Sequence, residues 1–186
     1  MKVFRIRLAK KRGDLAFALA DISDPEERRA LRLAKASGVA NATEEALAHF
    51  TPVWDFAAPR KVSIPTGWAL FLPLGTEVCS EKMWGVLHSL SNSGVWHEIP
   101  SLSEPPPHAR WGLLRNVSQA DVLDIQKSKF DPLGALFDPV LNPNHGDVPP
   151  FFVASGTDTF FASEVGKKAM LDSGLTGFAF EEVTVK

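Results

Sequence analysis

Hydrophobic and basic residues alternate near the N-terminus, where Phe4, Ile6 and Leu8 are separated by Arg5 and Arg7. Alternation with a period of two residues is typical of a β-strand with one buried face. Short apolar segments bounded by Gly, Pro, Asn or Ser recur along the chain and indicate further strands. The predicted strands are Lys2–Leu8, Leu15–Ile22, Val53–Phe56, Trp68–Leu72, Val95–Ile99, Leu113–Ile125, Val140–Leu141, Phe151–Ala154, Phe160–Phe161 and Phe178–Val185.

Helices are predicted where a capping residue precedes apolar positions spaced three and four residues apart. Asp24 followed by Pro25 is typical of a helix start. Met83, Leu87 and Leu90 would lie on one face of a helix. The predicted helices are Asp24–Ser37, Thr43–Phe50, Ser80–Ser91 and Ser163–Ser173, and the predicted surface loops are Ser103–His108 and Pro132–Pro150. The pattern predicts an α+β fold: a mixed, mainly antiparallel sheet with a few flanking helices.

Two segments of the chain align without gaps at an offset of 83 residues. Ser80-Glu81 aligns with Ser163-Glu164, and each serine can cap a helix whose first turn carries the glutamate. The remaining matches are Val78 with Phe161, Leu87 with Met170, Gly94 with Gly177, Val95 with Phe178, and Glu98 with Glu181. The alignment predicts two related strand–helix–strand units on one sheet.

The chain has 186 residues, which favours a single domain with residues 1–60 as a candidate N-terminal lobe. Its N-terminus lacks the continuous apolar run of a signal peptide, and no segment is apolar over a bilayer's thickness. A single cysteine, Cys79, favours a reducing compartment. We therefore expect a cytoplasmic protein that has no membrane partner.

Charge is distributed unevenly along the chain. Residues 1–40 carry ten Lys or Arg and five Asp or Glu, a net charge of +5, whereas residues 41–186 carry ten and seventeen, a net charge of −7. Complementary potentials speed the encounter of two proteins and fix their register. The acidic part could thus face a basic partner, although two ordinary solvated faces explain the same pattern.

Motifs that would indicate catalysis are absent from the sequence. It contains no glycine-rich phosphate loop and no G-x-S-x-G element, and its five histidines lack the spacing of a zinc site. It also has no nucleic-acid-binding motif. We expect no enzymatic activity, cofactor, metal or nucleic-acid partner. One alternative is a small enzyme with an unfamiliar site built on His97, Glu98 and His145.

The stretch WGLLRNVSQADVLDIQKSKF, from Trp111 to Phe130, resembles a recurrent segment of a bacterial immunity-protein family from polymorphic toxin systems. The family segment has an apolar lead-in, an Asn, an apolar stretch, an Asp and then a Ser. The corresponding residues are Leu113-Leu114, Asn116, Val122-Leu123, Asp124 and Ser128.

The stretch from Phe160 to Val183 resembles the C-terminal segment of the same family. The corresponding residues are Phe160-Phe161, Ser163-Glu164, Gly174-Leu175, Gly177 and Phe178. The resemblance covers roughly the second half of the chain. It implies an immunity protein that binds and neutralises a cognate toxin by occlusion, and it carries over no binding residue, because such residues vary with the toxin.

Exposed loops, aromatic residues and acidic residues mark the surface on which a toxin would bind. We expect it on the segments Glu104–Trp111 and Asp138–Val148, since partly exposed tryptophans are common interface anchors. The candidate partner-binding residues are Trp96, His97, Trp111, Asp131, Asp138, His145 and Asp147. A scaffold or oligomerisation module is a further alternative, and a homodimer is left open.

Overall fold

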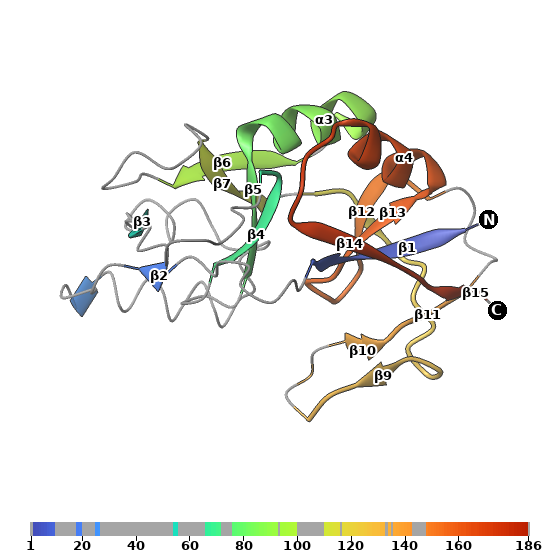
Figure 1. Ribbon diagram of the computed structural model, residues 1–186. Helices are drawn as coiled ribbons and strands as arrows, with labels where there is room; N and C mark the ends of the chain where they lie inside the picture. Colours follow the sequence, from blue (N-terminus) through green and yellow to red (C-terminus); the bar gives the residue numbers. More distant parts are fainter. Residues whose placement is uncertain are drawn as a thin grey trace.

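The structure, a computed structural model, describes residues 2–9, 18–19, 25–26, 54–55, 66–71, 76–92, 94–99, 110–115, 117–132, 134, 136–142 and 148–185. The predicted helices Asp24–Ser37 and Thr43–Phe50 and the predicted loop Ser103–His108 lie almost entirely outside these residues. The described part has two helices and several sheets, of which the main one is mixed and mostly antiparallel. The predicted α+β class is therefore confirmed (Figure 1).

Two larger sheets and two helices form the body of the molecule. The five-stranded sheet has the order β14-β1-β13-β12-β8, and the four-stranded sheet has the order β4-β5-β7-β6. The elements of the five-stranded sheet are β1 (Val3–Leu8), β8 (Gln119–Ala120), β12 (Phe151–Ala154), β13 (Phe160–Ser163) and β14 (Phe178–Glu182). Those of the four-stranded sheet are β4 (Trp68–Phe71), β5 (Thr76–Ser80), β6 (Val95–Ile99) and β7 (Trp111–Arg115), and the helices are α3 (Glu81–Ser91) and α4 (Glu164–Asp172).

Three short strand pairs complete the described elements. They are β2 (Ala18–Leu19) with β3 (Trp54–Asp55), β9 (Lys129–Phe130) with β10 (Leu136–Asp138), and β11 (Val140–Leu141) with β15 (Thr184–Val185). The last pair is parallel and joins the C-terminal strand to the segment between β8 and β12, two strands of the five-stranded sheet. The predicted strand Leu113–Ile125 is wrong as one element, because β7 ends at Arg115 and β8 covers only Gln119–Ala120.

The two sheets contain units with the same topology. In the first unit, β5 and β6 each pair antiparallel with β7, so they run parallel to each other and α3 connects them. In the second unit, β13 and β14 pair in the same way with β1, and α4 connects them. Each unit is a split β-α-β arrangement, and β4 or β12 adds an outer antiparallel strand. The predicted pair of related units is thus present, but on two sheets.

The predicted 83-residue offset holds from the outer strand to the start of each helix. Trp68 lies opposite Cys79 in the first unit, and Phe151 lies opposite Ala162 in the second. Backbone hydrogen bonds repeat at the same offset. The amide of Ser80 donates to the Gly67 carbonyl over 3.0 Å, and that of Ser163 donates to the Pro150 carbonyl over 3.1 Å.

Each helix begins at a serine in extended conformation whose hydroxyl accepts a hydrogen bond from the backbone amide three residues later. Ser80 accepts from Met83 over 3.2 Å, and Ser163 accepts from Gly166 over 3.3 Å. These bonds satisfy one of the amides that a helix start leaves without an intrahelical partner. The predicted helix starts are therefore confirmed.

The offset changes after the helices. Trp96 on β6 lies opposite Leu114, whereas Phe180 on β14 lies opposite Ile6. Leu114 and Ile6 belong to the same hydrophobic core, and Trp96 and Phe180 both pack against it. The structural counterpart of Trp96 is therefore Phe180, at an offset of 84. The stretch from the start of the helix to the start of the edge strand has the same length in both units, residues 81–94 and 164–177. The change of one residue therefore arises where the edge strand pairs with the central strand.

This shift changes the glutamate match that the sequence suggested. Glu98 corresponds to Glu182, and not to Glu181 as the ungapped alignment has it. The contacts agree with the corrected match. Glu98 pairs with Arg110, which directly precedes β7, and Glu182 pairs over 3.4 Å with Lys2, which directly precedes β1. Each unit thus has an ion pair between its edge strand and the residue before its central strand.

Buried residues form two clusters on the two faces of the five-stranded sheet. One cluster joins that sheet to α3, α4 and the four-stranded sheet: Ile6, Cys79, Met83, Leu87, Leu114, Val117, Phe151, Val153, Phe160, Ala162 and Met170. The other joins it to the segment between β8 and β12 and to the residue between β14 and β15: Val3, Val122, Leu136, Leu141, Phe152, Ala154, Phe161 and Val183. The two helices contact each other above the first cluster (Figure 1).

Candidate partner-binding surface

A two-stranded ribbon projects from the body and is drawn below the five-stranded sheet in Figure 1. We call the segment 123–141 the arm. It contains β9 and β10, in which Leu136 lies opposite Phe130 and Asp138 lies opposite Lys129, with a register shift between the two pairs. Such a shift leaves one extra residue on a strand, here Phe137. Phe137 therefore lies at an irregularity in the pairing of β9 with β10.

Local polar contacts shape the base of the arm. The backbone amides of Lys127 and Ser128 donate to the Asp124 carbonyl, and the Asp124 side chain also accepts from the Lys127 amide over 3.2 Å. The Ser128 hydroxyl is buried and accepts from the Val140 amide over 2.9 Å. Asp124 and Ser128, two residues that carry the family resemblance, thus stabilise the fold of the arm.

A turn and a long-range contact fix the outer part of the arm. The Gly134 amide donates to the Asp131 carbonyl over 3.0 Å, and Gly134 has the positive φ of 84° that glycine tolerates. Arg5 of β1 donates to the carbonyls of Phe137 and Leu136 over 2.9 and 2.6 Å. The Leu136 side chain is buried in the second core cluster. The arm is thus held against the sheet at one face.

The arm also exposes large hydrophobic side chains. Ile125 and Phe137 are each 68% exposed, and Phe130 is 40% exposed. These three account for half of the exposed large hydrophobic residues in the part of the chain that the structure describes; the others are Val95, Val165 and Leu171. Exposed apolar side chains that gather on one element are typical of an interaction site.

The surroundings of these side chains are acidic on balance. Residues 121–138 contain four aspartates and two lysines. Two of the predicted contact residues are among them: Asp131 is half-buried at the turn, and Asp138 pairs with Lys129 over 3.0 Å. The sequence prediction was thus directed to this element by its acidic residues and overlooked its apolar ones.

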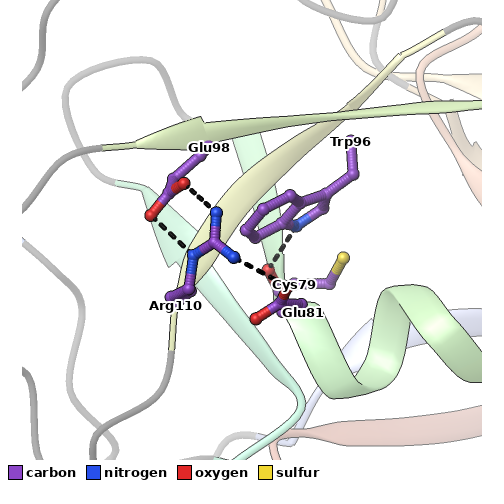
Figure 2. Close-up of polar contacts among 5 residues, drawn as sticks. All are labelled: Cys79, Glu81, Trp96, Glu98 and Arg110. Carbon is purple, nitrogen blue, oxygen red and sulfur yellow. Dashed lines mark hydrogen bonds and ion pairs between the residues drawn. The ribbon is translucent and has the colours of Figure 1, made fainter.

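A second group of side chains lies at the end of the four-stranded sheet (Figure 2). Arg110 donates to both carboxylate oxygens of Glu98 and donates to Glu81 over 2.9 Å. Its guanidinium carbon lies 5.5 Å from the Trp96 ring centroid. The hydrogen bond from Arg110 lowers the pKa of Glu98, and the same bond raises the pKa of Arg110. Both groups are therefore charged at neutral pH.

Cys79 lies behind this group and is fully buried. Its backbone carbonyl accepts a hydrogen bond from Nε1 of the half-buried Trp96 over 3.2 Å. Burial strongly raises the pKa of the Cys79 thiol. Because the thiolate is the nucleophilic form, a thiol in this position is suited to packing rather than to reaction.

The structure separates the residues predicted to form one binding surface. Trp96 and His97 are half-buried on β6, whereas Asp131 and Asp138 lie on the arm, well away from β6 in Figure 1. Trp111 is only 1% exposed and belongs to the interior. The last two predicted residues, His145 and Asp147, lie outside the described residues.

Sequence reasoning missed the residues that give the arm its character: Ile125, Phe130, Phe137 and the anchoring Arg5. The prediction of Pro132–Pro150 as a loop with one strand was wrong at β10. A signal was present in FDPLGALF, in which an Asp-Pro-x-Gly turn is flanked by apolar residues.

Comparison with known proteins gives no relative from which a role could be transferred. The chain matches no known protein-family model, and no curated protein is significantly similar to it. The resemblance to immunity proteins therefore stays a prediction. Among the described residues, no three side chains of the metal-binding types come together, and no helix is long and apolar enough to cross a membrane.

Proposed function

We propose that this protein binds and neutralises a cognate bacterial toxin as an immunity protein, and that the arm is its principal contact element. The observation that carries the proposal is the exposure of Ile125, Phe130 and Phe137 on a well-anchored ribbon. The resemblance of the chain to immunity proteins supplies the class of partner.

Anchoring of the arm supports a role in tight binding. Arg5 donates hydrogen bonds to two backbone carbonyls of β10, and the Ser128 hydroxyl binds the Val140 amide at the base of the arm. A contact element that is ordered before binding loses less conformational entropy when the complex forms. Aromatic residues are also prominent among the side chains that dominate interface energies, so Phe137 is the expected anchor.

Charge supports a basic partner. The arm and its flanks have an excess of aspartate, and residues 41–186 have a net charge of −7. An acidic binding surface accelerates association with a basic protein and makes the rate depend on ionic strength. We therefore expect the toxin to offer an apolar depression surrounded by lysines or arginines.

Rescue of growth tests the proposal. Cells that express the toxin domain encoded beside this gene should grow when the protein is coexpressed. Phe137→Ala should weaken the measured affinity by about thirtyfold, because loss of a dominant aromatic anchor costs about 2 kcal/mol or more. Failure of the wild-type protein both to rescue growth and to bind the toxin would contradict the proposal.

A matched control separates the arm from general loss of apolar surface. Val165 on α4 is 62% exposed, comparable with Phe137, but it lies on a helix away from the arm. Val165→Ala should leave the affinity for the toxin unchanged. An equal loss of affinity in both variants would show that the arm is not the contact element.

A further inference from the structure

A pocket of about 370 Å³ opens beside the arm on the five-stranded sheet. We call it the root pocket; it is lined by Arg5, Ile6, Arg7, Leu8, Asp158, Thr159, Phe160 and Ala179. Arg5 belongs to both features, since its side chain lines the pocket and its guanidinium binds the Phe137 carbonyl on the arm. The root pocket and the arm are therefore neighbours, joined by the Arg5 side chain.

The two arginines of the root pocket already have partners. Arg7 donates to Glu181 over 2.5 Å and forms an ion pair with it. Arg5 donates to the carbonyls of Leu136 and Phe137. These contacts occupy guanidinium donors that an incoming anion would need, so an anionic group is not the favoured occupant.

Asp158 is in the opposite situation. It lines the pocket and is exposed, yet partial burial of its carboxyl raises its pKa. Among the described residues, none donates a hydrogen bond to Asp158 or forms an ion pair with it. A carboxylate with partly lost hydration gains from a cationic donor, because charge-assisted hydrogen bonds replace the water that it has lost.

We propose that the arm and the root pocket form one docking surface, in which an apolar depression of the partner receives Phe137 and a lysine or arginine of the partner enters the root pocket to pair with Asp158. This inference rests on the proposed function and deepens it, since it names the chemistry of the partner at both points. The acidic balance of residues 41–186 favours the same basic occupant.

The size of the pocket fits this occupant. A volume of about 370 Å³ is at the lower end of the range for small-ligand sites, and one long side chain can occupy it. The aliphatic stem of lysine or arginine can pack on Ala179 while its charged end reaches the carboxyl. Asp158 and Ala179 of the lining are exposed, which allows a side chain to enter from a partner that covers the arm.

The test measures affinity for the toxin domain over a range of salt concentrations. Asp158→Asn should weaken binding by about tenfold at low salt and should reduce the dependence of affinity on salt, because it removes one ion pair. Phe137→Ala should weaken binding at every salt concentration and leave that dependence unchanged. Equal affinity and equal salt dependence of Asp158→Asn and wild type would overturn the inference.

The matched control removes an aspartate elsewhere on the surface. Asp172 at the end of α4 is 62% exposed and pairs with Lys168, and Asp172→Asn should bind the toxin as the wild type does. An Asp172→Asn protein with the same loss as Asp158→Asn would overturn the inference, because general charge would then explain both. If the wild type binds no toxin at all, the proposed function itself fails.

Measurement of the pKa of the Asp158 carboxyl provides a second test. Carbon-13 NMR of Asp158 in the free protein should show its raised pKa, and in the complex this pKa should fall, since a cation favours the charged form. An unchanged pKa in a complex that does form would overturn the inference while leaving the proposed function intact.

Discussion

The two split β-α-β units have the same topology but distribute large and small residues differently. In the first unit, Gly67 lies at the start of the outer strand and contacts Met83 on the helix. In the second unit, Pro150 takes the strand position and Gly166 takes the helix position, again in contact. The small residue has changed sides between the units. Each strand–helix contact thus keeps one glycine, although neither position keeps its residue type.

The sizes of the paired residues also differ between the units where the central strand meets the edge strand. Gly112 has no side chain, and the Trp96 indole occupies the space above it. The counterpart of Gly112 in the second unit is Phe4, which packs edge-on against Phe180 at a centroid distance of 6.3 Å. Exchanges of this kind explain how two units can share a topology while their sequences retain few identities.

The largest loss of stability is expected from a substitution in the helix of the second unit. A Cβ atom at Gly166 would lie 1.8 Å from the Pro150 carbonyl oxygen, a backbone atom that also accepts the hydrogen bond from Ser163. Gly166→Ala should therefore lower the free energy of unfolding by about 3 kcal/mol, as severe overpacking does. Urea denaturation measures the change. A loss below about 0.5 kcal/mol would mean that α4 can move away from Pro150 at little cost.

A smaller loss is expected where Trp96 crosses the central strand of the first unit. A Cβ atom at Gly112 would lie 2.5 Å from the Trp96 ring and 2.5 Å from the His97 carbonyl oxygen. Gly112→Ala should cost about 2 kcal/mol of stability. In a Trp96→Phe background the cost should be smaller, because the ring then resembles Phe180. Equal costs in both backgrounds, measured by a double-mutant cycle, would show that only the backbone contact matters.

A substitution in the helix of the first unit should instead increase the stability of the protein. Gly85 is exposed within α3, and a Cβ atom there would meet nothing within 4 Å. Gly85→Ala should raise the free energy of unfolding by about 0.5–1 kcal/mol, because alanine loses less backbone entropy in a helix. Thermal unfolding followed by circular dichroism measures the gain. Together with Gly166→Ala, it separates helix propensity from packing at a glycine.

The smallest effect concerns the ion pair of the first unit. Arg110 lowers the pKa of Glu98 in the folded protein, so the pair stabilises the fold above the ordinary glutamate pKa of about 4.3. That contribution is lost as the pH falls through the lower folded pKa. Arg110→Met should be slightly less stable than wild type at neutral pH, and the difference should vanish in acid. A difference that grows as the pH falls would contradict this assignment.

The local parts of the fold were accessible from the sequence because short-range chemistry specifies them. Ser80 and Ser163 were identifiable as helix caps, since a serine before an apolar helical pattern satisfies free backbone amides whatever the surrounding fold. The alternation in Lys2–Leu8 likewise identified β1. The candidate surface was only partly accessible: Asp131 and Asp138 were selected from the sequence, whereas Phe130 and Phe137 were not selected, because the exposure of an apolar residue depends on which distant segments cover it.

The sequence by itself indicated most of the longer strands, the starts of the two described helices and the resemblance between the two units. Only the tertiary structure decided that β1, from the far end of the chain, is the central strand of the second unit, that Glu98 corresponds to Glu182, and that Phe137 is exposed while Trp111 is buried. The physical reason is that periodicity and capping act between residues close in sequence. Exposure and strand order depend on which distant segments cover each face.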